Sequence, residues 1–186
     1  YQAYSGQGAV SLGAEANASG KQGVAIGQAS KATGTTSSAV GQAAQASGTS
    51  ASAFGKSSTA NADFATALGA SANAGGIGAV GLGNSSNAAA ANSVALGSAS
   101  KATHTNAVAI GPGVETTAAS RITMGDGSST YQTPGLTSLS GQDYSLVVSN
   151  QTGVLGVLNL GQLPENTTFC VGSGQEATCY GENASS

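Results

Sequence analysis

The residue types that most often catalyse reactions or bind metal ions are few and far apart in this sequence. Its 186 residues include one histidine, His104, and eight acidic residues that form no evident pair. A catalytic base or a metal site needs several such groups held together, so we interpret His104 as a residue of a solvent-exposed turn. Gly-x-Gly sequences such as Gly81-Leu82-Gly83 occur without the following helix that a dinucleotide site requires. The sequence therefore predicts neither an enzyme nor a bound cofactor or metal ion.

The two cysteines lie close together near the end of the chain. Cys170 and Cys179 enclose a polar octapeptide that contains two glycines. This arrangement favours a disulfide-closed hairpin in an oxidising compartment. A shared metal site is the weaker alternative, because a four-ligand site needs further partners and His104 is distant in sequence.

The charge pattern excludes two large classes of partner. Charged residues make up 7% of the chain, the net charge is −3, and the five basic residues are scattered. No basic patch is therefore expected for nucleic acid or for an anionic lipid surface. No apolar run approaches the roughly 20 residues of a membrane helix. Because the chain starts at Tyr1 without a basic and apolar leader, we expect a piece of a longer protein, with any membrane anchor elsewhere.

A glycine returns every fourteen residues, and this register is the strongest signal in the chain. The series is Gly13, Gly27, Gly41, Gly55, Gly69, Gly83, Gly97, Gly111 and Gly125. Residues 1–125 contain 18 Val, Ile, Leu, Met or Phe residues, and 15 of them lie one or three positions before a repeat glycine. A glycine-rich linker would not keep this placement, so the period indicates stacked structural units.

Counted from each repeat glycine as position 0, the pattern predicts two short strands per repeat. Position −1 is always apolar, position −3 is mostly Val, and position −2 is small. Positions +3 and +5 are Ala or Ser, whereas position +4 is polar. Because side chains alternate along a strand, we expect the −3 and −1 side chains to form an inner ladder that faces the small +3 and +5 residues. Position +7 is mostly glycine, which suggests a second corner with positive φ.

Strand, turn, strand and turn in fourteen residues suit a flattened, two-sided roll of about nine coils. Its apolar core would be thin, so its burial of apolar surface is modest against the ordering cost of the chain. A flat face of small residues is best used by packing identical rolls together, and cyclic symmetry is the usual arrangement.

These repeats resemble the head domains of trimeric autotransporter adhesins, the YadA-like family, whose core is Asn-Ser-Val-Ala-Ile-Gly-x-x-Ser. Residues 92–100, Asn-Ser-Val-Ala-Leu-Gly-Ser-Ala-Ser, match with one conservative change. Residues 22–30 and 106–111 match in part, and the resemblance covers about residues 8–125. It implies an all-β, left-handed parallel β-roll, a homotrimer, a role in virulence, and display on a Gram-negative outer membrane.

The rest of the chain has no fourteen-residue period. Residues 131–136 read as an extended segment closed by a Pro-Gly turn, and residues 145–158 read as a β-hairpin. We therefore expect β-roll head repeats over 1–125, a β-rich connector over 126–164, and a Cys-closed hairpin or tail over 165–186.

We interpret the chain as an adhesin segment that binds extracellular matrix such as collagen, host cells or abiotic surfaces by shallow, repeated contacts. The alternatives are a phage or virion tail fibre, a passive spacer, and an ice-binding solenoid, which would want a regular Thr ladder. The candidate ligand contacts lie at position +4 and in the repeats nearest the family core: Asn17, Lys31, Gln45, Asn73, Asn87, Asn92, Ser93, Ser100 and Lys101.

Overall fold

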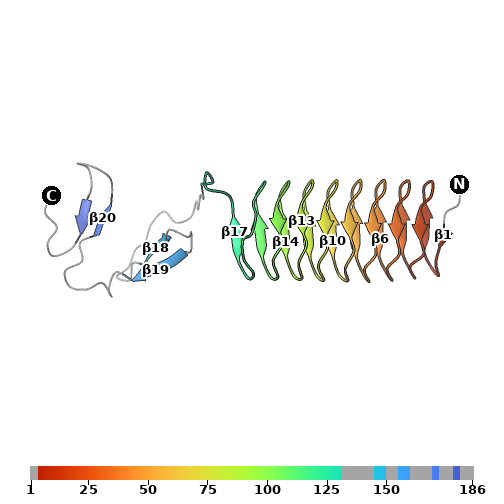
Figure 1. Ribbon diagram of the computed structural model, residues 1–186, viewed down its shortest axis with the longest axis horizontal. Coiled ribbons are helices and arrows are strands. Elements are labelled where there is room, and N and C mark those ends of the chain that lie inside the picture. The colour runs from red at the N-terminus through yellow and green to blue at the C-terminus, as the bar shows by residue number, and fades with distance from the viewer. Residues whose placement is uncertain (1–3, 131–144, 150–154, 160–168, 172–177, 181–186) are drawn as a thin grey trace. The chain divides into compact units, whose positions relative to one another are not determined.

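The computed structural model describes residues 4–130, 145–149, 155–159, 169–171 and 178–180. The chain divides into two units, residues 1–130 and residues 131–186. The first unit is a parallel β-solenoid of stacked fourteen-residue coils that run in order from β1 to β17 (Figure 1). All the regular structure described is β, which confirms the predicted parallel β-roll.

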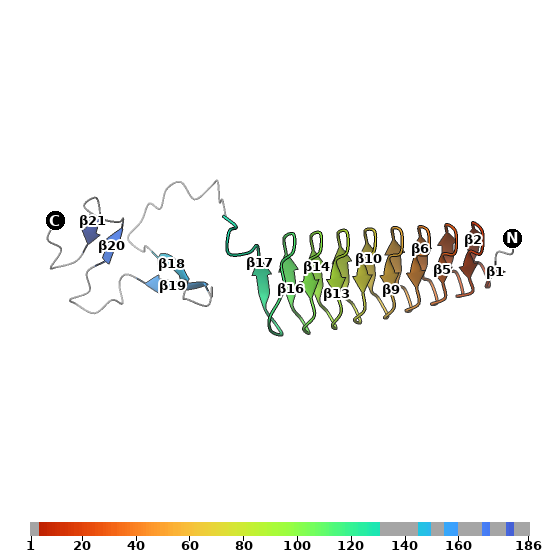
Figure 2. The same ribbon diagram turned by 45° about the horizontal axis from the view of Figure 1, so that its top comes forward.

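Two parallel sheets form the two sides of the solenoid, and each coil except the last gives one strand to each sheet (Figure 2). The eight-stranded sheet consists of β1 (Tyr4–Ser5), β3 (Asn17–Ala18), β5 (Lys31–Ala32), β7 (Gln45–Ala46), β9 (Thr59–Ala60), β11 (Asn73–Ala74), β13 (Asn87–Ala88) and β15 (Lys101–Ala102). The nine-stranded sheet consists of β2 (Val10–Leu12), β4 (Val24–Ile26), β6 (Ser38–Val40), β8 (Ser52–Phe54), β10 (Thr66–Leu68), β12 (Val80–Leu82), β14 (Val94–Leu96), β16 (Val108–Ile110) and β17 (Ile122–Met124).

The ladders keep the register of the sequence repeat. From β2 to β17, each strand pairs with the equivalent strand fourteen residues away, so Thr66 lies opposite Val80 and Asn73 lies opposite Asn87. The first pair, β1 with β3, is offset by thirteen residues, with Tyr4 opposite Asn17. Equivalent positions of successive coils therefore form straight rows, one strand spacing of about 4.8 Å apart.

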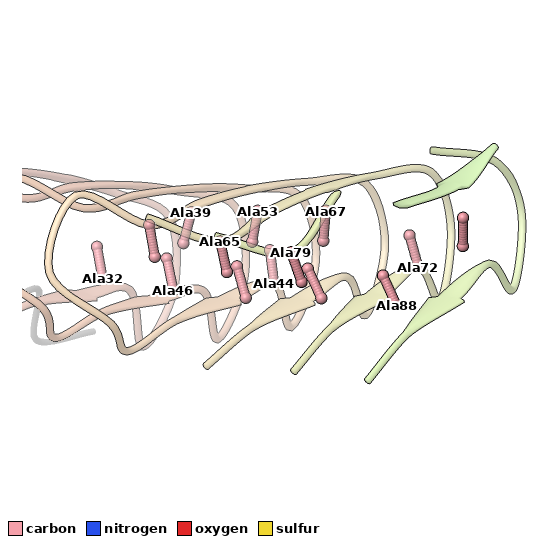
Figure 3. Close-up of a cluster of buried hydrophobic side chains, with 14 of the residues drawn as sticks. Ala32, Ala39, Ala44, Ala46, Ala53, Ala65, Ala67, Ala72, Ala79 and Ala88 are labelled. Carbon is pink, nitrogen blue, oxygen red and sulfur yellow. The ribbon is translucent and has the colours of Figure 1, made fainter. Parts of the chain in front are cut away.

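The interior contains small side chains, not the large ones. Ala at positions −2, +3 and +5 is fully buried in nearly every coil, as Ala39, Ala44 and Ala46 illustrate (Figure 3). Buried serines fill the remaining inward positions, and they bond to the turns: Ser30 Oγ donates to the Gly27 carbonyl oxygen at 2.9 Å. The predicted inward placement of positions +3 and +5 is therefore confirmed.

The predicted inner ladder of Val, Ile and Leu is wrong. The −3 and −1 side chains lie on the outer face of the nine-stranded sheet, where Leu12 is 63% exposed and Leu68 is 47% exposed. The residue between them, at position −2, points inward instead, and it is small in every repeat because the two sheets are too close together for anything larger. The last coil differs, since Val114 and Thr116 are buried where other coils carry Ala or Ser, and these larger side chains close that end of the core.

The repeat glycines are required by backbone geometry. Gly27 has φ near +125°, and a Cβ on it would lie 2.6 Å from the carbonyl oxygen of Gly41 in the next coil. Both constraints exclude a side chain at position 0.

The prediction of positive φ at the position +7 glycines is wrong. Besides the repeat glycines at position 0, positive φ occurs at positions +2 and +9, in residues such as Ser57 and Asn92, each of which is the third residue of a four-residue turn. The +7 glycines are explained by a close approach instead: a Cβ on Gly34 would collide with the carbonyl oxygen of Gly48 in the next coil. Later coils carry Ala62, Ala90 and His104 at this position.

The second unit contains two antiparallel pairs. Strands β18 (Ser145–Ser149) and β19 (Leu155–Asn159) pair with Val147 opposite Val157, which confirms the predicted hairpin. Strands β20 (Phe169–Val171) and β21 (Thr178–Tyr180) form the other pair. The predicted extended segment at 131–136 lies outside the described residues.

Enlarging one inward alanine should destabilise the roll. Ala95 is fully buried in β14, so Ala95→Leu is expected to cost about 1–3 kcal/mol of unfolding free energy through overpacking. Ala89→Leu, in the same region but exposed, is the matched control and should change the free energy by less than about 0.5 kcal/mol. Thermal unfolding followed by circular dichroism measures both, and equal midpoints would contradict a core closed to larger side chains.

Candidate binding surfaces

The roll has two outer faces of opposite character, and each is built by one sheet. The outer face of the nine-stranded sheet carries the −3 and −1 rows, and we call it the apolar face. The outer face of the eight-stranded sheet carries positions +4 and +6, and we call it the polar face.

The polar face contains a straight row of hydrogen-bonding side chains. The +4 residues occupy the first position of each short strand, directly opposite one another in register: Asn17, Lys31, Gln45, Thr59, Asn73, Asn87 and Lys101. Glu115 extends the row, because its backbone forms an isolated parallel β-bridge with Lys101. The fold therefore brings together the +4 residues predicted as ligand contacts.

Neighbouring members of this row contact one another. Asn73 Nδ2 donates to Asn87 Oδ1 at 2.8 Å, and Lys101 Nζ lies 3.4 Å from Glu115 Oε2. The Lys101 and Glu115 side chains are more than half exposed, so this ion pair contributes little to stability. Lys31 and Gln45 are exposed, and Asn17 Oδ1 is buried without a hydrogen-bond partner within the described residues. The row is a partly exposed surface of amides, one hydroxyl and charged groups.

Two of the predicted contact residues are not on any surface. Ser93 and Ser100 are fully buried, and their hydroxyls donate to the carbonyl oxygens of Ala90 and Gly97. This corrects their prediction as ligand contacts, because they stabilise the turns from inside. Asn92 is exposed on a turn and its amide donates to Asn106 Oδ1 at 3.2 Å.

Both faces also contain residues that were not among the predicted ligand contacts. Thr59 and Glu115 belong to the polar row. Both lie four residues after a repeat glycine, so the repeat spacing was sufficient to predict them. Position +6 is exposed in every coil and flanks that row: Ser19, Thr33, Ser47, Asn61, Gly75, Ala89, Thr103 and Thr117. The alternation that places +4 outward also places +6 outward. The apolar face was missed because its side chains were expected inside.

The apolar face is a large exposed surface for a single chain. All nine −1 residues are apolar, and Phe54, Leu82 and Leu96 are each 36–38% exposed. Single soluble chains seldom expose contiguous apolar patches larger than a few hundred Å². A surface of this kind is typical of interaction sites.

The residue types that bind metal ions do not cluster in the described part of the chain. No group of three or more His, Cys, Asp or Glu side chains that could hold a metal ion occurs among them. His104 sits in a turn, where Nδ1 lies 3.3 Å from the Thr103 hydroxyl. Hydrogen bonds from the Ser128 side chain and backbone and from Ser129 hold the pKa of Asp126 below its usual value, which stabilises a turn at the end of the roll. Nor does the described part of the chain contain a helix long and apolar enough to cross a membrane.

A stacked parallel roll with one apolar and one polar face defines a repetitive binding or structural protein. Comparison with known proteins gives the family. The sequence model of one protein family, the YadA head domain repeat, matches residues 5–30, 32–56, 46–72, 74–100 and 91–113. The chain belongs to this family, whose members are adhesins, a non-enzymatic kind of protein.

A solved structure supports the same assignment. The collagen-binding domain of the Yersinia adhesin YadA is 32% identical to this chain, with a TM-score of 0.63. The match covers 83% of this chain and 79% of that domain. No curated protein sequence matches.

Proposed function

We propose that this chain is the adhesive head segment of a homotrimeric surface fibre, which attaches a Gram-negative bacterium to matrix proteins such as collagen, to host cells or to abiotic surfaces. We further propose that a region outside these 186 residues anchors the fibre in the outer membrane. The observation that carries the proposal is the pairing of one apolar and one polar face on the same rigid roll.

The apolar face supports assembly of three copies. Its −3 and −1 rows, in which Val, Leu and Ile predominate, run the length of the roll and have no covering element within the described part of the chain. Packing three such faces around a common axis would remove them from water, at roughly 25 cal/mol per Å² of apolar surface buried. Closed cyclic symmetry would also leave no copy with an uncovered face.

The polar face supports adhesion by repeated contacts. It offers amides, hydroxyls and lysines at a fixed spacing, and its +4 row contains no aromatic side chain to anchor a single tight site. Each contact is therefore weak. Three rows per trimer and many fibres per cell raise the effective concentration, and overall avidity can gain about 10²–10⁴. Binding of collagen by the similar Yersinia domain makes collagen the first ligand to test.

Assembly can be tested with one charge on the apolar face. Leu96→Asp places a carboxylate where the trimer would bury it, so we expect the mass measured by light scattering to fall from three chains to one. The control is Asn87→Asp, which lies in β13 on the polar face. It keeps an acceptor for the Asn73 amide, so this variant should remain trimeric. A wild-type chain that is a stable monomer would remove the basis for the proposed assembly.

Adhesion can be tested by removing whole coils. Deletion of residues 84–111 removes two repeats and joins Gly83 to Pro112 in the original register. Cells that display this variant should bind collagen-coated surfaces less well than cells that display the full chain. A point variant of the polar face, Lys31→Glu with Lys101→Glu, should weaken attachment without changing the mass of the trimer. Unchanged adhesion of both variants to every surface tried would mean that this segment is a passive spacer.

We also propose that Cys170 and Cys179 form a disulfide. They lie directly opposite each other in the antiparallel pair of β20 and β21, and Cα atoms of such pairs are about 4.5–5.5 Å apart, within the range that a disulfide spans. Mass spectrometry of non-reduced peptides should show residues 170 and 179 linked, and two free thiols would refute the bond. Cys170→Ser should leave the unfolding of the roll unchanged, since each coil contacts only its neighbours.

A further inference from the structure

Three consecutive coils interrupt the apolar face with hydroxyl groups. Position −3 is Val or Ile in six coils, but it is Ser38 in β6, Ser52 in β8 and Thr66 in β10. Ser38 pairs with Ser52, and Ser52 pairs with Thr66, so the three side chains are direct neighbours. We call these three residues the hydroxyl block.

The hydroxyls of this block have no partner within the part of the chain that the structure describes. The block is half-buried on the single chain. The serines inside the roll behave differently, since Ser37 Oγ donates to the Gly34 carbonyl oxygen at 2.7 Å. The block therefore presents donors and acceptors to whatever covers the apolar face.

A second feature marks the same coils. Phe54 lies two residues after Ser52 on β8, and it is the one aromatic side chain among the eighteen −3 and −1 positions of the apolar face, all of which are described. The middle of the face thus differs from both ends in polarity and in side-chain size.

The repeat itself creates a problem for assembly. Because successive coils are nearly alike, a copy that slips along the roll by one coil, about 4.8 Å, still sets Val and Leu rows against Val and Leu rows. Such a slip loses contacts only at the ends. Apolar packing alone therefore specifies the axial register of the copies weakly, as with any strictly periodic interface.

We propose that the hydroxyl block sets the axial register of the assembled copies. This inference rests on the proposed trimer, and its partner is a second and a third copy of this chain. In register, the hydroxyls of Ser38, Ser52 and Thr66 meet those of the other copies and bond directly or through shared water. After a slip of one coil, hydroxyls at one edge of the block face Val24 or Val80 of a neighbour and lose their partners.

The arrangement follows a general device for specifying register. A single buried asparagine in a coiled coil selects one alignment at a cost in stability, because misaligned partners leave it unpaired. The hydroxyl block would do the same here. Val at all three positions should therefore give an assembly at least as resistant to heat as the parent but less uniform in register.

The test measures the distance between equivalent residues of different copies. Cys170 and Cys179 are replaced by serine, Ser98→Cys on an exposed turn carries a spin label, and the protein is refolded from denaturant so that the register is chosen freely. Pulsed electron paramagnetic resonance should give one narrow distance for this parent. The triple variant Ser38→Val, Ser52→Val and Thr66→Val should add longer distances from slipped copies.

A matched control changes the same coils on the polar face. Thr33→Val, Ser47→Val and Asn61→Val remove polar groups from exposed positions there, and the single narrow distance should persist. The inference is overturned if the triple variant of the hydroxyl block gives the same single distance as this control. It is also overturned if that variant does not assemble, because Val is the residue at position −3 in five other coils. Sedimentation of the parent separates the two proposals, since a monomeric parent refutes the trimer itself.

Discussion

The closeness of the two sheets is the constraint on which the rest of this structure depends. Four-residue turns join the short strands at both edges, and the interior between the sheets admits Ala and Ser but nothing larger until the last coil. A chain folded this way cannot bury its Val, Ile and Leu residues by itself. Those residues lie instead along one outer face, where they form an exposed apolar surface of the kind that is typical of interaction sites.

The sequence predicted the framework well because the framework is periodic. Repeat glycines located one turn, and the alternation around position +4 located the second strand and its outward side chains. The inside and outside of the first strand do not follow from alternation alone, because large apolar side chains on one face and small ones on the other are both suited to burial. Both faces of that strand are suited to burial, Ala25 against the other sheet and Val24 with Ile26 against a further surface. The sequence feature that could have predicted the correct side is the small residue at position −2, because an interior that admits only small side chains must be narrow.

Position +7 was misinterpreted for a related reason. Glycine was linked to positive φ, yet serine, asparagine, alanine and even Phe64 occupy the positions with positive φ. At Gly34 and Gly48 the backbone of the next coil approaches too closely for a Cβ, and this contact between coils is not revealed by local sequence. Likewise Ser93 and Ser100 match the family core, but a motif does not say which of its side chains hold a turn from inside and which reach a ligand.

Hydrogen bonds in the turns connect each coil to its neighbours, and they help to stabilise a roll whose core contains mostly small side chains. Fourteen residues other than glycine adopt positive φ in this roll, a conformation that is costly for most side chains and persists only where the surroundings determine it. Here the surroundings are the adjacent coils, since the positive-φ residues bond across them: Ala29 N donates to the Ala14 carbonyl oxygen and Ala43 N to that of Gln28, both at 2.8 Å. One coil alone would have neither the ladder nor the core to offset the cost. The roll is therefore stable only as an array. The same contacts between coils hold the turns rigid, and this rigidity keeps the polar row straight, with equivalent side chains at a fixed spacing.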